Sequence, residues 1–374
     1  MKLRPLLVSI ALLAPLSAVV WWLGRPSAAA VPVDSRVGQR IADPASLSNA
    51  ARIELKSDGK TLTFNRTADG RWVLEGSPAL PADLTRLARL SNDLVTPKID
   101  RLVSSRAEKI ATYELDKTSV IYRDSSGKAL FDLRLGKTAD GGGRILRIGE
   151  ETSAYLARLN VSLDTEAASW RDTALLTGLS TNDVASVRIG FSATPQPVVI
   201  TREKSDQPWV SAATPAGQRV KASLLSTQTG NLTTLRYTNI APSLDPAVVA
   251  ARVFPRDVTL TTFSGRTITL TFSRAPEPPA QPPPAVKEGE TPPTAPAPAP
   301  RPVYVAVADS QANPILVEAA KTHAFEIGEW IYTALPATPA DLFEPDPAAK
   351  TTDPVSVTTP PLTAPEPSKS NVQP

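Results

Sequence analysis

Trp170-Arg171-Asp172-Thr173-Ala174-Leu175 is followed, 160 residues later, by Trp330-Ile331-Tyr332-Thr333-Ala334-Leu335. Four of the six positions are identical, and one of the four is a tryptophan, of which the chain has only six. A match of this kind at a fixed spacing indicates an internal repeat. We therefore expect the chain to contain two related structural units.

The two halves also align upstream of this match, but with a shift of 137 residues. Arg71-Trp72-Val73 then pairs with Pro208-Trp209-Val210, and the run 131–135 pairs with 268–272. The change of shift falls in one place, where residues 136–143 of the first copy correspond to the longer stretch 273–303 of the second. A duplication with one loop insertion explains both shifts. It predicts one unit over residues 48–180 and another over 181–336.

Each copy has the sequence pattern of an α+β unit. In the first, short alternating apolar runs are separated by turns such as Ser57-Asp58-Gly59, which is typical of antiparallel strands. Pro81-Ala82-Asp83 then opens a segment whose apolar residues recur at helical spacing. Further strands are expected at 120–122, 130–135, 145–148 and 154–159. We predict a mainly antiparallel sheet with one amphipathic helix in each copy.

The second copy repeats this order in a weaker form. Strands are expected at 187–189, 198–200, 209–210, 258–260, 267–272 and 303–307. A helix is expected over 224–235, although its threonines and Gly230 are poor helix formers. The insertion carries 12 prolines between Pro276 and Pro302, so it is predicted to be an extended, solvated loop. Residues 337–374 have the same composition and are expected to form a disordered tail.

The N-terminus predicts export. Residues 6–23 are apolar except for Ser9, Pro15 and Ser17, and Lys2 and Arg4 precede them. A helix of this length reaches roughly 27 Å, enough for the hydrocarbon core of a bilayer. The segment, taken as residues 1–25, is interpreted as a transmembrane anchor with the body of the chain exported. A cleaved signal peptide is the alternative, because Ala28-Ala29-Ala30 could serve as its cleavage site. Residues 26–47 are expected to be a linker.

Composition restricts the possible functions. The formal net charge of +3 falls to zero once Lys2, Arg4 and Arg25 are left out, so nucleic-acid binding is not expected. The chain has no cysteine, which excludes disulfides, thiolate metal sites and a cysteine nucleophile. It also has a single histidine, His323, to which the first copy has Leu163 as counterpart. We predict no catalytic, cofactor-binding or metal-binding residues, and so a protein that is not an enzyme.

Several motifs resemble sites but fit structural roles better. Leu135-Gly136-Lys137-Thr138 ends like a phosphate-binding loop, but Phe131 stands where that motif needs glycine. Gly141-Gly142-Gly143 lies between two predicted strands and is interpreted as a turn. The carboxylate pairs, Glu150 with Glu151 and Asp164 with Glu166, are expected on the solvated surface. The repeated tryptophans are expected to be core anchors rather than a ligand groove; they are Trp72, Trp170, Trp209 and Trp330.

The order of these pieces resembles a bacterial, membrane-anchored family of unknown function, encoded beside gliding-motility-type ABC transporter components. The resemblance is carried by the N-terminal apolar segment, Gly70-Arg71-Trp72-Val73-Leu74, Pro81-Ala82-Asp83, Tyr113-Glu114-Leu115-Asp116, Leu133-Arg134-Leu135-Gly136 and Trp170-Arg171-Asp172. It covers about residues 48–180 well and the second copy more loosely. It implies an inner-membrane protein with a periplasmic body that assists an ABC-type transport system.

Two functions follow as expectations. The first is a non-enzymatic, membrane-tethered periplasmic module that binds a protein partner in an ABC-type transporter complex. The second is a periplasmic ligand-binding protein that uses the cleft between the two repeats, because pockets favour domain interfaces. An envelope hydrolase is a third and weaker alternative, with His323 as its most obvious candidate residue.

Overall fold

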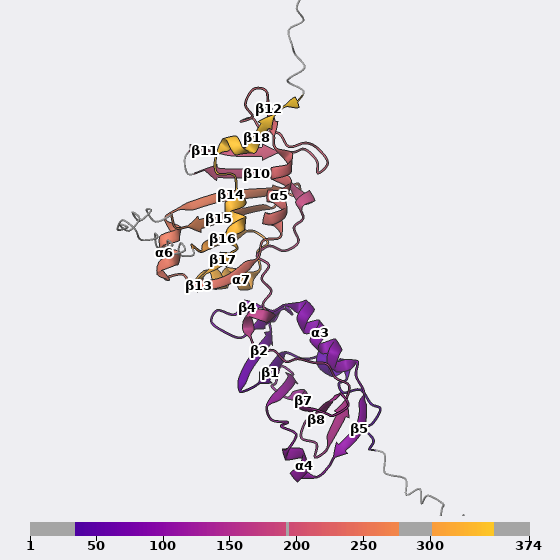
Figure 1. Ribbon diagram of the computed structural model, residues 1–374. Helices are drawn as coiled ribbons and strands as arrows, with labels where there is room; N and C mark the ends of the chain where they lie inside the picture. Colours follow the sequence, from indigo (N-terminus) through magenta and orange to yellow (C-terminus); the bar gives the residue numbers. More distant parts are fainter. Residues whose placement is uncertain (1–33, 192–193, 277–300, 348–374) are drawn as a thin grey trace, which may run out of the picture. The chain divides into compact units, whose positions relative to one another are not determined.

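The computed structural model describes residues 34–191, 194–276 and 301–347 (Figure 1). Contacts within the chain divide it into two compact units. The first comprises residues up to Glu75 together with Ala82–Arg171, and the second comprises Gly76–Pro81 and the chain from Asp172 onward. The sequence-based division at 180/181 lies a few residues inside the second of these units.

The expected class, a mixed α+β fold dominated by antiparallel sheets, is confirmed. The predicted transmembrane segment lies outside the described residues. Among the residues that were described, no helix is both long and apolar enough to cross a membrane. The part of the insertion from 277 to 300 also lies outside them, as does the tail from 348 onward.

The first unit is built on one antiparallel sheet. Its strands lie in the order β3-β2-β1-β6-β7-β8-β9-β5 (Figure 1). Along the chain the elements are α2 (Pro44–Ser48), β1 (Arg52–Ser57), β2 (Lys60–Arg66), β3 (Trp72–Leu74), α3 (Leu84–Val95), β5 (Ile99–Ser104), α4 (Ala107–Ala111), β6 (Thr118–Arg123), β7 (Ala129–Thr138), β8 (Arg144–Ile148), β9 (Ala154–Ala157) and the 3₁₀ turn η1 (Ala167–Trp170).

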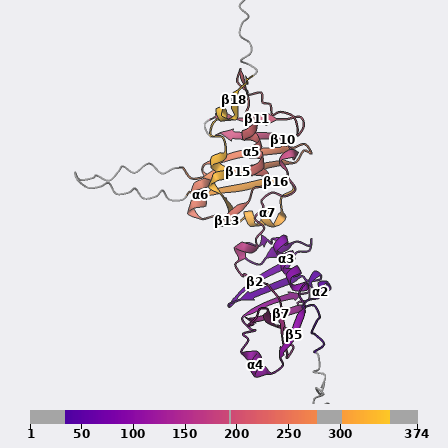
Figure 2. The ribbon, with the colours of Figure 1, turned by 45° about the vertical axis from the view of Figure 1, so that its right-hand side comes forward.

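The second unit repeats this order, and its sheet runs β11-β10-β14-β15-β16-β17-β13 (Figure 1, with a second view in Figure 2). Position by position, these strands correspond to β2-β1-β6-β7-β8-β9-β5 of the first sheet. The elements are β4 (Leu80–Pro81), η2 (Thr181–Asp183), β10 (Val184–Phe191), β11 (Thr194–Thr201), β12 (Gln218–Val220), α5 (Ala222–Thr233), β13 (Tyr237–Pro242), α6 (Pro246–Arg252), β14 (Pro255–Thr262), β15 (Thr267–Arg274), β16 (Val303–Asp309), α7 (Pro314–Ala320), β17 (His323–Ile327), α8 (Glu329–Ala334), η3 (Pro339–Leu342) and β18 (Phe343–Pro345).

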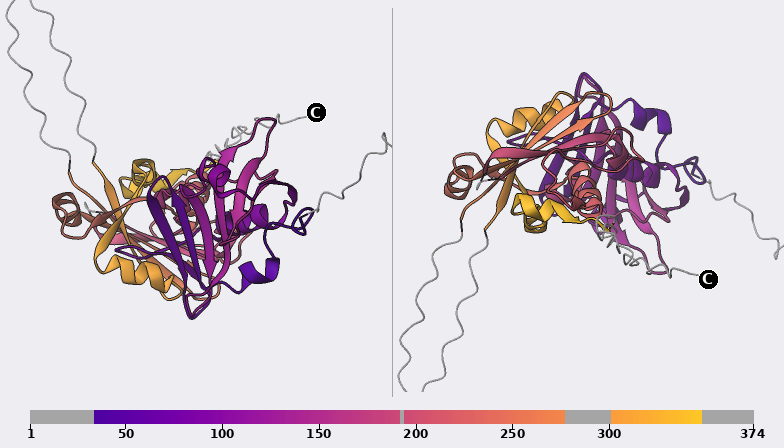
Figure 3. Two further views of the ribbon diagram at one scale, coloured as in Figure 1. Left: turned by 90° about the horizontal axis from the view of Figure 1, so that it is seen from below. Right: turned by 90° about the horizontal axis from the view of Figure 1, so that it is seen from above.

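One long helix covers a face of each sheet, and the sheets twist in the usual way (Figures 1 and 3). Helix α3 begins after Asp83, whose carboxylate caps the Arg86 amide, and it buries Leu87, Leu90 and Leu94 at helical spacing. Helix α5 instead buries two leucines together with Gln228, Thr229 and Thr233. The Thr229 hydroxyl donates to the Leu225 carbonyl at 2.8 Å, which satisfies the buried hydroxyl without a partner outside the helix.

Three expectations are corrected. Residues 34–47 are not a free linker, because Ile41, Ala42 and Leu47 are buried in the first core and the Gly38 amide donates to the Ile99 carbonyl. Residues 337–347 are not part of a disordered tail, because β18 pairs with β12 and Leu342 is fully buried. Each unit also has short helices beside its single twelve-residue helix, so the prediction of one helix in each was too simple.

The predicted insertion has slightly different borders. Ser273 and Arg274 belong to β15, and Val303 opens β16. The strands that flank the insertion therefore extend to both of its predicted ends. Arg274 pairs directly with Val303 in the ladder between β15 and β16.

Candidate functional site

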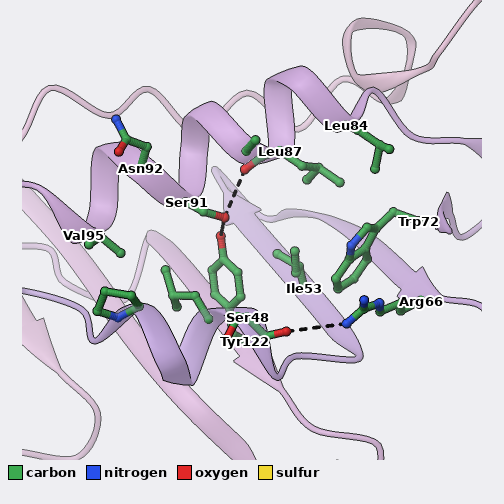
Figure 4. A pocket seen from close by; sticks show the side chains of 13 residues that line it. Ser48, Ile53, Arg66, Trp72, Leu84, Leu87, Ser91, Asn92, Val95 and Tyr122 are labelled. Carbon is green, nitrogen blue, oxygen red and sulfur yellow. Dashed lines mark hydrogen bonds between the residues drawn. The ribbon is translucent and has the colours of Figure 1, made fainter. Parts of the chain in front are cut away.

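The first unit has an apolar groove between α3 and the sheet, which we call the α3 groove (Figure 4). Its volume is about 530 Å³, within the range of small-molecule pockets. The lining comes from α2, α3, β1, β2, β3 and β6. The lining residues are Pro44, Leu47, Ser48, Ile53, Arg66, Trp72, Leu84, Leu87, Ala88, Ser91, Asn92, Val95 and Tyr122.

Buried apolar side chains form the floor of the groove. Leu47, Ile53 and Leu87 are between 3% and 6% exposed, and each belongs to the hydrophobic core of the unit. Leu84 is 58% exposed at the rim of the groove. The groove therefore offers apolar surface to a ligand without any change in the core beneath it.

Two hydroxyl groups lie at the floor of the α3 groove. The Ser91 hydroxyl donates to the Leu87 carbonyl at 3.0 Å, so the Tyr122 hydroxyl is the donor in the 3.1 Å bond between Tyr122 and Ser91 (Figure 4). Burial raises the pKa of Tyr122 to about 12. Tyr122 is therefore neutral at physiological pH, and the floor carries no charge.

Arg66 is the one charged side chain of the lining, beside Trp72 at one end of the groove (Figure 4). Its guanidinium donates to the Gly70 and Ser48 carbonyls at 3.4 and 3.5 Å. These are long hydrogen bonds. Among the residues that the structure describes, Arg66 pairs with no carboxylate. A cation with two weak partners at the end of an apolar groove is suited to an anionic group.

The second unit has a different candidate surface around α6, at one end of its strands (Figures 1 and 2). Four large apolar side chains within residues 244–254 are exposed: Leu244 at 88%, Val253 at 68%, Val249 at 49% and Phe254 at 48%. The other side of α6 is packed, since Val248 and Ala251 are buried against Tyr304 and Ala324. We call the exposed residues the α6 surface.

The motifs that resembled active sites have structural roles. Leu135–Thr138 is the end of β7, and Gly136 is there because a Cβ would come within 2.4 Å of the Tyr113 carbonyl oxygen. Gly141, Gly142 and Gly143 all have φ between 85° and 94°, which confirms the turn interpretation. His323 begins β17, and its Nδ1 lies 2.8 Å from the hydroxyl of its neighbour Thr322. No three acidic or histidine residues of the described chain are placed to hold a metal ion.

The carboxylates divide into two groups. Glu150 and Glu151 pair with Arg134 and Arg36 at the surface, as expected of solvated residues. Asp164 is more than a surface residue, because its carboxylate accepts hydrogen bonds from Ser169, Arg86 and the Glu166 amide. The hydrogen bond from Ser169 is the main cause that lowers the pKa of Asp164. This cluster fixes the turn that leads to Trp170.

Four functional candidates were missed in the sequence, and three of them left no signal there. Burial raises the pKa of Asp132, and nearby Arg134 opposes that rise, but the alternating pattern of β7 gives no sign of a perturbed carboxylate. Arg66 reads as the polar end of a strand, and Leu84 as one more apolar residue of the helix. Only the exposed apolar run near 244–254 had a signal, because Leu244 and Phe254 flank a short helix opened by Pro246.

The tryptophans do not share one role. Trp170 and Trp209 are buried, at 2% and 8% exposure, which agrees with core anchors. Trp72 is half-buried and lines the α3 groove. Trp330 is 60% exposed, so the anchor prediction was wrong there. Its indole lies against Gly328, and the neighbouring Ile331 is buried in its place.

Comparison with known proteins gives a match to one family model and no function. Residues 72–251 match the model of a family described as a domain of unknown function (DUF4340). The matched region begins at Trp72 of the α3 groove and ends within α6. No curated protein and no solved structure matches the chain.

Proposed function

We propose that this protein is a non-enzymatic module, tethered in the bacterial inner membrane with its body in the periplasm, that binds a protein partner in an ABC-type transport system. The α6 surface carries the proposal, because exposed apolar side chains gathered in one segment are typical of docking sites. The apolar segment at residues 6–23 supports the tether. The choice of an ABC-type partner rests on the family resemblance of the sequence.

The test is site-specific cross-linking in native membranes. A photoactivatable amino acid at Phe254 is expected to cross-link to a transporter subunit, because its side chain is 48% exposed within the α6 surface. The same amino acid at Lys204, an exposed position of the same unit, serves as the control. Val253→Asp is expected to abolish the cross-link, whereas Val317→Asp on α7, exposed to 48%, leaves it intact. Recovery of the protein with no transporter subunit would contradict the proposal.

A ligand-binding role is the second candidate, and the α3 groove is the observation that favours it. The sequence led us to expect a ligand in the cleft between the repeats. The groove that supports ligand binding lies instead within the first unit. A rise in melting temperature with a periplasmic small molecule would support this role.

We further infer that the two units arose by duplication. The shared order of seven strands supports this origin, as does the position of a twelve-residue helix before β5 and β13. Duplication releases one copy from a shared role. We therefore expect the α3 groove and the α6 surface to serve different partners.

A further inference from the structure

We propose that the α3 groove binds an anionic amphiphile, a molecule with one aliphatic chain and a carboxylate or phosphate group. The apolar floor supplied by Leu47, Ile53 and Leu87 would hold the chain. Arg66 at one end would pair with the anionic group. This inference rests on the second candidate role, ligand binding in the α3 groove, and uses none of the evidence for the docking role.

The shape of the groove favours a chain over a compact ligand. Figure 4 shows the lining spread along α3, with Leu84 and Trp72 towards one end and Val95 towards the other. Leu84 and Val95 are the first and last residues of α3, so the groove follows the whole helix. An extended aliphatic chain fits such a lining, and each methylene group of the chain that is buried there contributes favourably to the free energy of binding.

The charge of the lining favours an anion. The Tyr122 and Ser91 hydroxyls are engaged with each other and with the Leu87 carbonyl, so they add little to recognition of a charge. Arg66 retains donors, because its two carbonyl contacts are long and use Nε and Nη1. Guanidinium binds carboxylate and phosphate through paired hydrogen bonds. A neutral lipid would leave that capacity unused.

In the second unit, the arginine that corresponds to Arg66 is engaged in short hydrogen bonds. Arg202, just after β11 as Arg66 is at the end of β2, donates to the Val184, Thr181 and Ser205 carbonyls at 2.6 to 2.8 Å. Its guanidinium also lies 4.5 Å from the Trp209 ring. The Arg202 guanidinium therefore makes three short hydrogen bonds within its unit, whereas that of Arg66 makes only two long ones.

The experiment maps where a lipid-like probe reacts on the full-length protein in membranes. A dodecanoate that carries a diazirine group is cross-linked by light, and its adducts are located by peptide mass spectrometry. We expect adducts on residues that line the α3 groove. Dodecanoate is expected to compete for this labelling more strongly than dodecanol, which has the same chain but no charge.

Three variants make the test specific. Arg66→Gln is expected to weaken competition by dodecanoate about tenfold and to leave competition by dodecanol unchanged, because only the anion loses a charged partner. Ala88→Trp is expected to abolish groove labelling, since Ala88 is an exposed residue of the lining and the indole would fill the groove. Arg89→Gln is the matched control, because Arg89 lies on the same helix, outside the lining, with its side chain 84% exposed.

The source of the ligand is resolved by a further arm with lysophosphatidylglycerol. Stronger competition by this lipid than by dodecanoate would assign a membrane phospholipid product, and the reverse would assign a free fatty acid. Both results support the proposal. Adducts scattered over both units would overturn it, as would equal competition by dodecanol and dodecanoate. So would unchanged labelling of Ala88→Trp that keeps the wild-type melting temperature.

Discussion

The two units have the same strand order, but they treat the space beside their long helices differently. In the first unit α2 packs against β7, and the α3 groove stays open with Arg66 at its end. In the second unit η2 packs against α5, and Arg202 covers Trp209. The sheet topology therefore does not decide where a site can form. The two units differ there in the packing of the short segment before the first strand and in the contacts of the arginine.

The outer faces of the sheets differ as well. In the first unit this face carries ion pairs, among them Glu54 with Arg123 and Asp132 with Arg134. In the second it carries hydroxyls, and Thr259 and Thr269 lie within 3.3 Å of each other across β14 and β15. Both faces are polar, as expected for antiparallel sheets with one solvated side. The two units therefore share their strand order, whereas the outer faces of their sheets carry different polar side chains.

The largest expected effect concerns the tryptophans that revealed the repeat. Trp170→Ala should decrease the free energy of unfolding by an amount near the upper end of the range of about 3–5 kcal/mol. Its indole meets the Phe64 ring edge-on at 5.3 Å, lies 4.4 Å from the Arg86 guanidinium and donates to the Asp164 carbonyl at 2.7 Å. Trp330→Ala should change it by no more than about 0.5 kcal/mol, since the side chain is exposed. Urea denaturation measures both, and equal losses would show that the copies use their tryptophans alike.

The next effect concerns an ion pair of the second unit. Arg266 meets Asp309 through two hydrogen bonds of 3.0 and 2.6 Å, and the two side chains are 4% and 1% exposed. Asp309→Asn should cost about 3 kcal/mol of stability, because it leaves a buried guanidinium without its counter-charge. By strand register the first-unit counterpart is Glu150, whose side chain is 85% exposed. Glu150→Gln should cost less than about 1 kcal/mol, and a similar loss at both positions would refute the contrast.

Acid should destabilise the protein through the same pair. Burial alone would raise the pKa of Asp309, but the hydrogen bond from Arg266, the hydrogen bond from the Gln311 amide and the charge of Arg266 together outweigh it and lower that pKa below its usual 3.8. A carboxyl with a lowered folded-state pKa stabilises the fold fully above its unfolded pKa, and this contribution is lost as the pH falls through the folded one. As the pH falls below about 4, protonation of Asp309 should thus lower the free energy of unfolding by at most about 1.4 kcal/mol per pH unit. Chemical denaturation across this range should give a shallower slope for Asp309→Asn than for the wild type, and identical slopes would contradict it.

Much of the fold could be predicted because the buried layer is written as alternation and helical spacing. The strands at 120–122, 130–135, 258–260 and 267–272 were found for this reason. The strand that follows the long helix was missed in both copies; it is β5 in the first and β13 in the second. Each is at the edge of its sheet and has register shifts against its neighbour, so its apolar residues do not alternate.

The candidate sites were harder to predict than the fold. A groove exists where side chains fail to fill a space, and a sequence records which residues are apolar without recording which spaces they leave. Leu84 and Leu87 look equivalent in the helical pattern, yet one is 58% exposed and the other is buried. Arg66 and Arg202 occupy the same place in the repeat and differ only in their surroundings. Such differences depend on tertiary packing, which periodicity does not encode.

The smallest expected effect compares a glycine in the long helix of the second unit with a glycine in a strand of the first. Gly230 lies inside α5, and a Cβ built on it would meet no atom within 4 Å. Gly230→Ala should therefore stabilise the protein by about 0.5–1 kcal/mol, because alanine loses less backbone entropy when the helix forms. Gly136→Ala is the control with opposite sign, since its Cβ would lie 2.4 Å from the Tyr113 carbonyl oxygen. Thermal unfolding distinguishes the two. A loss of stability in Gly230→Ala would mean that α5 needs a glycine at this position for packing. The poor helix formers of α5 would then be explained by how the core packs around them.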